Sequence, residues 1–180
     1  MALWIAFLRA INVGGTNLLP MRDLVALCHP LGFLQVRTCL QSGNVVFNSE
    51  RSAEQVKGLL EGALSARLGR PVDVLVRSAT ELAAILKANP FPEADPAKVA
   101  VVLLTAKPSA TWLTRVSIRD DEVVRRGKRE LYIHYPRGMG RSRLRLPPLD
   151  GPCTARNVNT IAKLVGMTAG DARLRGNRTT

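Results

Sequence analysis

Aromatic side chains and histidines are scarce in this sequence. Phe, Trp and Tyr together make up 4% of the 180 residues, and the two histidines, His29 and His134, stand far apart. Sequence-specific binding of single-stranded nucleic acid uses aromatic side chains that stack on bases, and this chain has few of them. Histidine-based acid–base catalysis needs a well-placed imidazole, and neither histidine has a suitable neighbour in the sequence. We therefore expect neither mechanism.

Motifs for metals, disulfides and common cofactors are missing as well. The pair Gly14-Gly15 lacks the lysine that follows the glycines of a Walker-type phosphate loop, and the sequence has neither a three-glycine dinucleotide fingerprint nor a GxSxG elbow. The cysteines are odd in number and have no CxxC spacing, which favours reduced, buried thiols; they are Cys28, Cys39 and Cys153. We expect no metal and no cofactor, and we assign no catalytic residue.

Long apolar runs are absent too, since none approaches the roughly 20 residues that a membrane-spanning helix needs. Residues 1–8 are apolar, but no basic residue precedes them and no small-residue cleavage site follows. We interpret this segment as a first strand and not as a signal peptide. With a mean hydropathy of +0.04, the chain has the composition of a globular protein. We expect a cytoplasmic protein without a membrane partner.

Positive charge is what the sequence has in excess. The formal net charge is +12, from 26 Lys and Arg against 14 Asp and Glu. Most of the excess comes from arginines between residues 125 and 145, and the planar guanidinium group suits phosphate. Two explanations stay open, a surface that binds phosphates and a basic face that only keeps the protein soluble. The acids Asp120, Asp121 and Glu122 lie in a charged loop, where we expect them to be solvated.

The first 77 residues alternate strand and helix patterns. Apolar spacing and turn residues predict strands and two helices, one after Pro20 and one after the capping box at 52–55. The expected strands are 3–11, 36–41, 45–47 and 72–76. The right-handed crossover rule folds this order most simply as a ferredoxin-like sheet with strand order 4-1-3-2. The fold class is α+β, a ferredoxin-like βαββαβ N-terminal half packed against a second, smaller α+β half.

The remaining sequence predicts another small α+β unit without an internal sequence repeat. We expect subdomains at 1–78 and 79–170 and a flexible tail at 171–180. The predicted elements are a helix after a capping box at 78–81, a strand at 99–104, a short helix from Pro108, a hairpin of 122–125 with 130–135, a short basic helix within 138–146 and a final helix starting at 154–157.

The predicted strand order brings two polar turns together. Strand three returns between strands one and two, so the end of strand one and the turn between strands two and three lie at one sheet edge. Glycine-bearing turns expose peptide N–H groups to which anions bind, although both segments also fit ordinary tight turns. The candidate ligand-binding residues at this edge are Arg9, Asn12, Gly14, Gly15, Asn17, Gln41, Ser42 and Asn44.

Several segments, taken in order, resemble the bacterial family called domain of unknown function 1697. They are residues 7–15, 41–47 and 154–160, and residues 89–91 are similar to a further shared piece. The resemblance spans essentially the whole chain. It implies a two-part α+β fold and no established activity, so it supplies no catalytic residue.

The resemblance also suggests that the third segment belongs with the two N-terminal turns. Arg156 and Asn157 would then join the candidate site from the start of a helix, whose N-terminus favours anions. Val158 stands where the family commonly has tryptophan, which argues against stacking at that position.

Three functional hypotheses follow from this polar cleft. The first is binding of a phosphate-bearing small molecule or a nucleic-acid backbone. The second is an enzyme that acts on a nucleotide-like substrate, with Arg9 or Arg156 stabilising the developing charge. The third is a non-catalytic interaction module whose motifs serve only folding.

Overall fold

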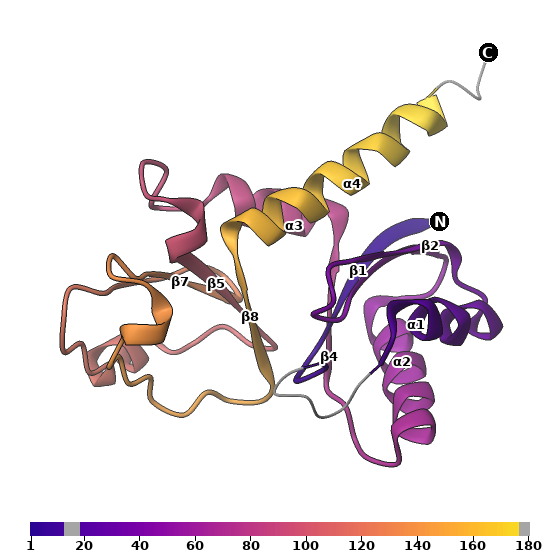
Figure 1. Ribbon diagram of the computed structural model, residues 1–180. Helices are drawn as coiled ribbons and strands as arrows, with labels where there is room; N and C mark the ends of the chain where they lie inside the picture. Colours follow the sequence, from indigo (N-terminus) through magenta and orange to yellow (C-terminus); the bar gives the residue numbers. More distant parts are fainter. Residues whose placement is uncertain (13–18, 177–180) are drawn as a thin grey trace. The chain divides into compact units, whose positions relative to one another are not determined.

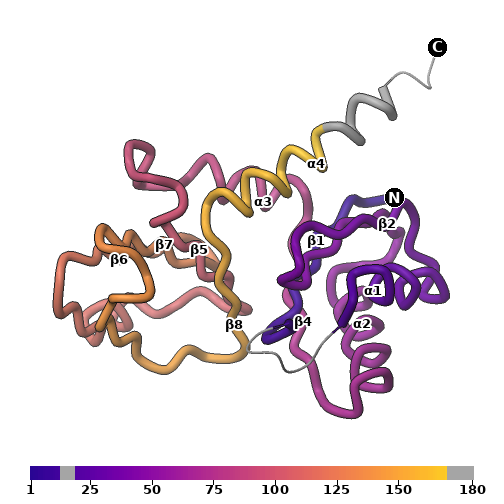
Figure 2. The backbone as a smooth tube through the Cα atoms, in the orientation of Figure 1, coloured from indigo at the N-terminus to yellow at the C-terminus, as the bar shows by residue number. Residues whose placement is uncertain are grey.

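Residues 1–12 and 19–176 are described by the structure, a computed structural model, with side chains described up to residue 169 (Figures 1 and 2). The chain divides into two compact units. The first comprises residues 1–82 and the C-terminal segment from residue 163, and the second comprises residues 83–162. Both boundaries between the units fall inside helices.

A four-stranded antiparallel sheet forms the centre of the first unit. Its strand order is β2-β3-β1-β4, which is the predicted order 4-1-3-2. The elements are β1 (Ala2–Leu8), α1 (Met21–Cys28), the 3-10 turn η1 (His29–Leu31), β2 (Leu34–Cys39), β3 (Asn44–Ser49), α2 (Ala53–Leu68) and β4 (Val74–Ser78).

Helices α1 and α2 pack on one face of this sheet (Figure 1). The predicted capping box opens α2, because Ser52 accepts from the Gln55 amide and Gln55 returns a bond to the Ser52 amide. Gly69 ends the helix in the left-handed conformation. Alternate strand residues and the apolar helix stripes form the core, which includes Ala6, Leu8, Val45, Phe47, Val74, Leu24, Cys28, Val56, Leu60 and Leu64.

Strand boundaries in the first unit differ from the predicted ones where the backbone turns. Strand β1 ends at Leu8 and not at residue 11, because Ala10 and Asn12 both take a positive φ (53° and 57°). Strand β2 ends at Cys39 because Leu40 also has a positive φ, 60°. Strand β4 extends to Ser78, where it pairs with Trp4 of β1.

The second unit repeats the same strand order. Its antiparallel sheet runs β6-β7-β5-β8, so its four strands are arranged as β2-β3-β1-β4 are in the first unit. The elements of the second unit are η2 (Pro96–Lys98), β5 (Val99–Leu104), η3 (Ala110–Arg115), β6 (Val123–Arg126), β7 (Glu130–His134), η4 (Met139–Arg141) and β8 (Cys153–Asn157). The helices α3 (Ala79–Lys87) and α4 (Val158–Gly176) each contain a boundary between the units. The units share a topology although the sequence shows no repeat.

A helix follows the last strand of each sheet without a linker. At the first junction Ser78 and Glu81 form the predicted reciprocal cap, with bonds of 3.1 and 2.9 Å. At the second, the Asn157 side chain accepts from the Thr160 amide at 2.9 Å. Each strand therefore ends in a residue whose side chain starts the next helix.

Three predictions in the second unit need correction. The segment expected to start the final helix, 154–157, is strand β8, because it pairs with β5 along Leu103 to Ala100. The basic helix expected within 138–146 is only the 3-10 turn η4, since Gly138 has a φ of 87° and Arg145 pairs with Ser117. The short helix expected from Pro108 is the 3-10 helix η3.

The C-terminal end of the chain also differs from its prediction in extent. Helix α4 continues to Gly176, so the tail predicted at 171–180 begins inside a helix, and residues 177–180 lie outside the described part. None of the helices within the described residues is long and apolar enough to cross a membrane.

Candidate functional site

The two polar turns of the first unit meet, as the strand order predicts. The Asn12 side-chain amide donates to the Gln41 carbonyl at 2.7 Å. At the same edge the Leu8 amide donates to the Gly43 carbonyl at 2.8 Å. The end of β1 and the β2–β3 turn are therefore joined through both side chain and backbone. Gly14, Gly15 and Asn17 lie outside the described residues.

Asn12 directs both ends of its amide into the protein. Its oxygen accepts from the Leu19 amide at 2.7 Å, and its nitrogen donates to the Leu19 carbonyl at 3.0 Å as well as to Gln41. These bonds join Asn12 to Leu19 and to the β2–β3 turn. The observed role of Asn12 is thus structural, and its left-handed backbone suits asparagine.

Asn44 has a similar structural role. Its side chain is fully buried and donates to the Cys39 carbonyl at 2.8 Å and to the Ser42 hydroxyl at 3.0 Å. Gly43 has a φ of 71°, and a Cβ there would stand 3.0 Å from the Leu8 Cβ. The Asn44 side chain therefore holds the hairpin turn together, and Gly43 lets the turn lie close to the end of β1.

Arg9, the cation predicted at this edge, is paired with an acid. Its guanidinium lies 2.9 Å from the Asp73 carboxylate, and its amide donates to the Asp73 carbonyl at 3.0 Å. The ion pair is solvent-exposed, so it contributes little to stability. It does link the ends of β1 and β4 at the rim that the sequence predicts.

The third predicted segment lies in the second unit. The Arg156 guanidinium, on β8, donates to the Thr154 hydroxyl and the Ala155 carbonyl, each at 2.8 Å. Burial lowers the pKa of Arg156 to about 10, which leaves it charged at neutral pH. Asn157 caps α4. Because these residues and the turns of the first unit belong to different units, the joining of all three segments stays a prediction.

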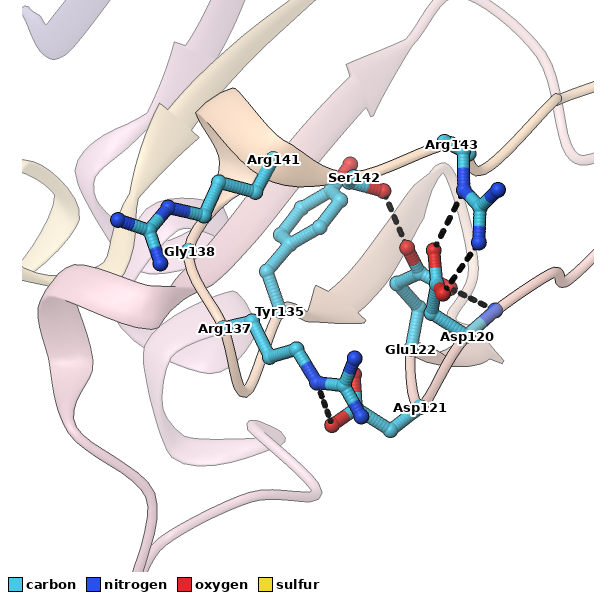
Figure 3. A pocket seen from close by; sticks show the side chains of 9 residues that line it. All are labelled: Asp120, Asp121, Glu122, Tyr135, Arg137, Gly138, Arg141, Ser142 and Arg143. Carbon is cyan, nitrogen blue, oxygen red and sulfur yellow. Dashed lines mark hydrogen bonds and ion pairs between the residues drawn. The ribbon is translucent and has the colours of Figure 1, made fainter.

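A pocket that sequence analysis missed lies at the open end of the β6–β7 hairpin. It has a volume of about 300 Å³ and lies between the loop before β6 and the loop after β7 (Figure 3). Its lining combines acids, arginines and two hydroxyl groups: Asp120, Asp121, Glu122, Tyr135, Arg137, Gly138, Arg141, Ser142 and Arg143. Among the described residues, no group of three His, Cys, Asp or Glu side chains is arranged to hold a metal ion.

Glu122 is buried in this pocket, so the expectation that it is solvated is wrong. Only 5% of the residue is exposed. Its carboxylate accepts from the Ser142 hydroxyl and from the Asp120 amide. These bonds hold the pKa of Glu122 below its usual value of 4.5, with the Ser142 bond as the largest cause. Burial and the Glu122 charge raise the pKa of Tyr135 beside it.

Two ion pairs fix the rim of the pocket. Arg143 binds both carboxylate oxygens of Asp120, at 2.8 and 3.2 Å, and this bond is the main cause that lowers the pKa of Asp120. Arg137 contacts Asp121 at 3.1 Å. The third arginine, Arg141, extends away from these acids (Figure 3). The sequence signal for this pocket is the acid triplet at 120–122 followed by arginines at 137, 141 and 143.

Comparisons with known proteins show a family and a fold but no activity. A family model described as "Protein of unknown function (DUF1697)" matches residues 1–132. The solved structure of the conserved bacterial protein SP0830 from Streptococcus pneumoniae is similar, with a TM-score of 0.74 and 22% identity. The match covers 92% of this chain and 98% of that one. No curated protein matches.

Replacing Asn12 with aspartate tests its role as a structural clamp. The Asn12→Asp variant keeps the acceptor for the Leu19 amide but loses both donated bonds and places a carboxylate against two carbonyls. We expect a loss of about 2 kcal/mol in the free energy of unfolding, measured by urea denaturation. Gln41→Ala is the control, because Asn12 contacts only the Gln41 backbone. Unchanged stability of Asn12→Asp would contradict this role.

Removing the Ser142 hydroxyl tests the buried Glu122 through pH. Because the folded-state pKa of Glu122 lies below 4.5, its ionised form stabilises the fold above that pH, and this stabilisation is lost as the pH falls. Ser142→Ala should therefore lower the melting temperature at pH 6 more than in the acid range. The Ser142 hydroxyl also accepts a hydrogen bond from the Leu144 amide, and loss of that bond would lower the melting temperature equally at every pH. A difference in melting temperature that does not change with pH would therefore show that Glu122 is not involved.

Proposed function

The chain belongs to the DUF1697 family of proteins of unknown function, and we propose a function for it that the family does not assign. We propose that it is a cytoplasmic protein whose second unit binds the phosphates of a nucleic-acid backbone. The observation that carries this proposal is the charge of residues 115–145. This stretch holds ten Lys and Arg against four Asp and Glu. In the first unit, the all-antiparallel βαββαβ order supports a ferredoxin-like classification of the scaffold.

The positive charge of this stretch is available to solvent. Asp120 and Asp121 pair with Arg143 and Arg137, while the other two acids, Glu122 and Glu130, are buried. The exposed bases in the stretch are Arg115, Arg119, Arg125, Lys128, Arg129, Arg137, Arg141, Arg143 and Arg145. Arginine-rich surfaces bind phosphate backbones mainly by releasing counterions, without reading bases. The scarcity of aromatic residues agrees with this mode.

The N-terminal motifs support a structural role beside this binding function. Asn12 and Asn44 place their amides on internal partners, and Asn157 caps a helix. Amide groups with internal partners are what we expect if these motifs serve only folding. The enzyme hypothesis relied on Arg9 or Arg156, and both guanidinium groups contact neighbouring protein atoms. We therefore place the binding function in the second unit.

A small phosphate ester in the pocket at residues 120–143 is the second candidate. The observation that favours it is Arg141, which lines the pocket and makes no side-chain hydrogen bond or ion pair with the rest of the described chain (Figure 3). The volume of about 300 Å³ is at the lower end for small-molecule sites. A phosphate group there would be bound by Arg141 and by the outer N–H groups of Arg137, whose Nε already contacts Asp121.

Salt dependence of binding to a short labelled DNA duplex tests the first candidate. We expect micromolar or tighter binding at low salt and a steep loss of affinity as salt rises, by about 0.9 logarithmic units per phosphate contact for each tenfold increase in salt. Fluorescence anisotropy measures both. Neutralising four second-unit bases should flatten this slope: Arg125→Gln, Lys128→Gln, Arg141→Gln and Arg145→Gln.

The matched control removes the same charge from the first unit. It replaces four bases outside the proposed surface with glutamine: Arg22, Arg51, Lys57 and Arg67. This variant should keep most of the wild-type affinity and slope. Absence of wild-type binding at low salt would overturn the proposal, and so would equal losses in the two variants.

Thermal shift with a nucleoside monophosphate tests the second candidate. A ligand that binds only the folded protein raises its melting temperature in proportion to the logarithm of its concentration. We expect such a rise for the wild type and none for Arg141→Gln. Arg145→Gln is the control, because Arg145 is exposed but does not line the pocket. If the wild type shows no rise, the pocket does not bind such esters.

A further inference from the structure

The turn between β6 and β7 is built around a buried carboxylate. Glu130, the first residue of β7, is 5% exposed. Its oxygens accept from the Lys128 amide at 3.1 Å and the Arg129 amide at 2.9 Å. The Gly127 amide donates to the Glu130 carbonyl at 2.8 Å. Consecutive N–H groups that converge in this way form a typical anion-binding turn, and here the anion is the protein's own side chain.

The Tyr132 side chain lies beside that carboxylate within the second unit. The Tyr132 hydroxyl lies 3.3 Å from the Glu130 carboxylate and donates to the Ile85 carbonyl at 2.8 Å. Burial and the charge of Glu130 raise the pKa of Tyr132, so its hydroxyl stays protonated. The carboxylate that organises the turn therefore lies beside a hydroxyl group that is itself bonded to α3.

The turn is also tied to the end of β5. The Leu104 amide donates to the Arg129 carbonyl at 3.0 Å, and the Arg126 guanidinium donates to the Pro108 carbonyl at 3.0 Å. The backbone of the turn is thus held at Arg129, and the Arg126 side chain is bound to the loop after β5. The side chains of Lys128 and Arg129 are exposed. A fixed backbone reduces the ordering cost when charged side chains bind a partner.

The first unit has a corresponding turn, between β2 and β3, that carries no charged side chain. Its Leu8-to-Gly43 bond corresponds in topology to the Leu104-to-Arg129 bond of the second unit. The first turn, residues 40–43, carries no charged side chain, whereas the β6–β7 turn, residues 127–129, carries the two bases Lys128 and Arg129. One topology therefore supports an uncharged turn in one unit and a basic turn in the other.

We propose that the β6–β7 turn, residues 127–129, is the element that contacts nucleic-acid phosphates, and that Glu130 is the positioning residue that presents Lys128 and Arg129 to them. This inference rests on the proposed function and assigns its binding surface. The buried carboxylate binds the backbone N–H groups, so the contacts with the partner are made by the side chains. The partner is a phosphate backbone, which is read without base contacts.

Neutralising the turn tests its part in binding. The double variant Lys128→Gln with Arg129→Gln should lose roughly tenfold in affinity for the labelled duplex at moderate salt, and its salt slope should fall by about two. The matched control is Arg115→Gln with Arg119→Gln, which removes equal charge from exposed residues of the same unit. Equal losses in the two variants would overturn this inference and leave the proposed function intact.

Replacing Glu130 separates positioning from net charge. Glu130→Gln removes one negative charge and so raises the net charge of the protein by one. If electrostatic attraction alone decided affinity, the variant would bind the duplex more tightly. The positioning role predicts weaker binding, by roughly threefold or more, because glutamine offers one acceptor oxygen where the turn needs two. Tighter or unchanged binding by a folded Glu130→Gln variant would overturn the inference.

Gly127→Ala provides a second test that leaves the charge unchanged. A Cβ at residue 127 would collide with the Glu130 side chain and displace its carboxylate. We expect the same direction of effect, weaker binding with a lower salt slope, while circular dichroism confirms the fold of each variant. If wild-type binding itself is absent, the proposed function fails. If the wild type binds and folded Gly127→Ala binds equally well, only the role of Glu130 fails.

Discussion

One backbone hydrogen bond, made once in each unit, lies at the sheet edge where we propose that binding takes place. In the first unit it joins Leu8 to Gly43 at 2.8 Å, and in the second it joins Leu104 to Arg129 at 3.0 Å. Both follow from the antiparallel order in which the third strand of a unit pairs with the first. The end of a central strand is thereby held against a hairpin turn, whatever residues that turn contains.

The two units use this edge differently. In the first, polar side chains bind protein atoms, because Asn12 bonds to Leu19 and to the Gln41 carbonyl, and the buried Asn44 bonds to the Cys39 carbonyl. In the second, buried Glu130 binds the backbone of the turn from inside, and the bases Lys128 and Arg129 face solvent. A chain with few aromatics and a net charge of +12 can bind a partner through such a turn without stacking.

Local sequence signals predicted much of the fold. The capping boxes at Ser52 and Ser78 and the helix stop at Gly69 each depend on residues within one helical turn, and the first sheet order follows from handedness. Features that depend on contacts between residues far apart in the sequence were not predicted. Residues 154–157 form a strand because they pair with β5, some fifty positions earlier in the chain. Glu122 is buried, and its carboxylate accepts from Ser142, which lies in another loop 20 positions later in the chain.

Backbone amide chemical shifts of the protein, recorded by NMR during titration with a short DNA duplex, test the central claim most directly. The account predicts that the largest shift changes fall on residues 127–129 and on neighbouring bases of the second unit, and that they decline as salt is raised. Changes concentrated at Asn12 and residues 41–44, with the β6–β7 turn unaffected, would contradict it.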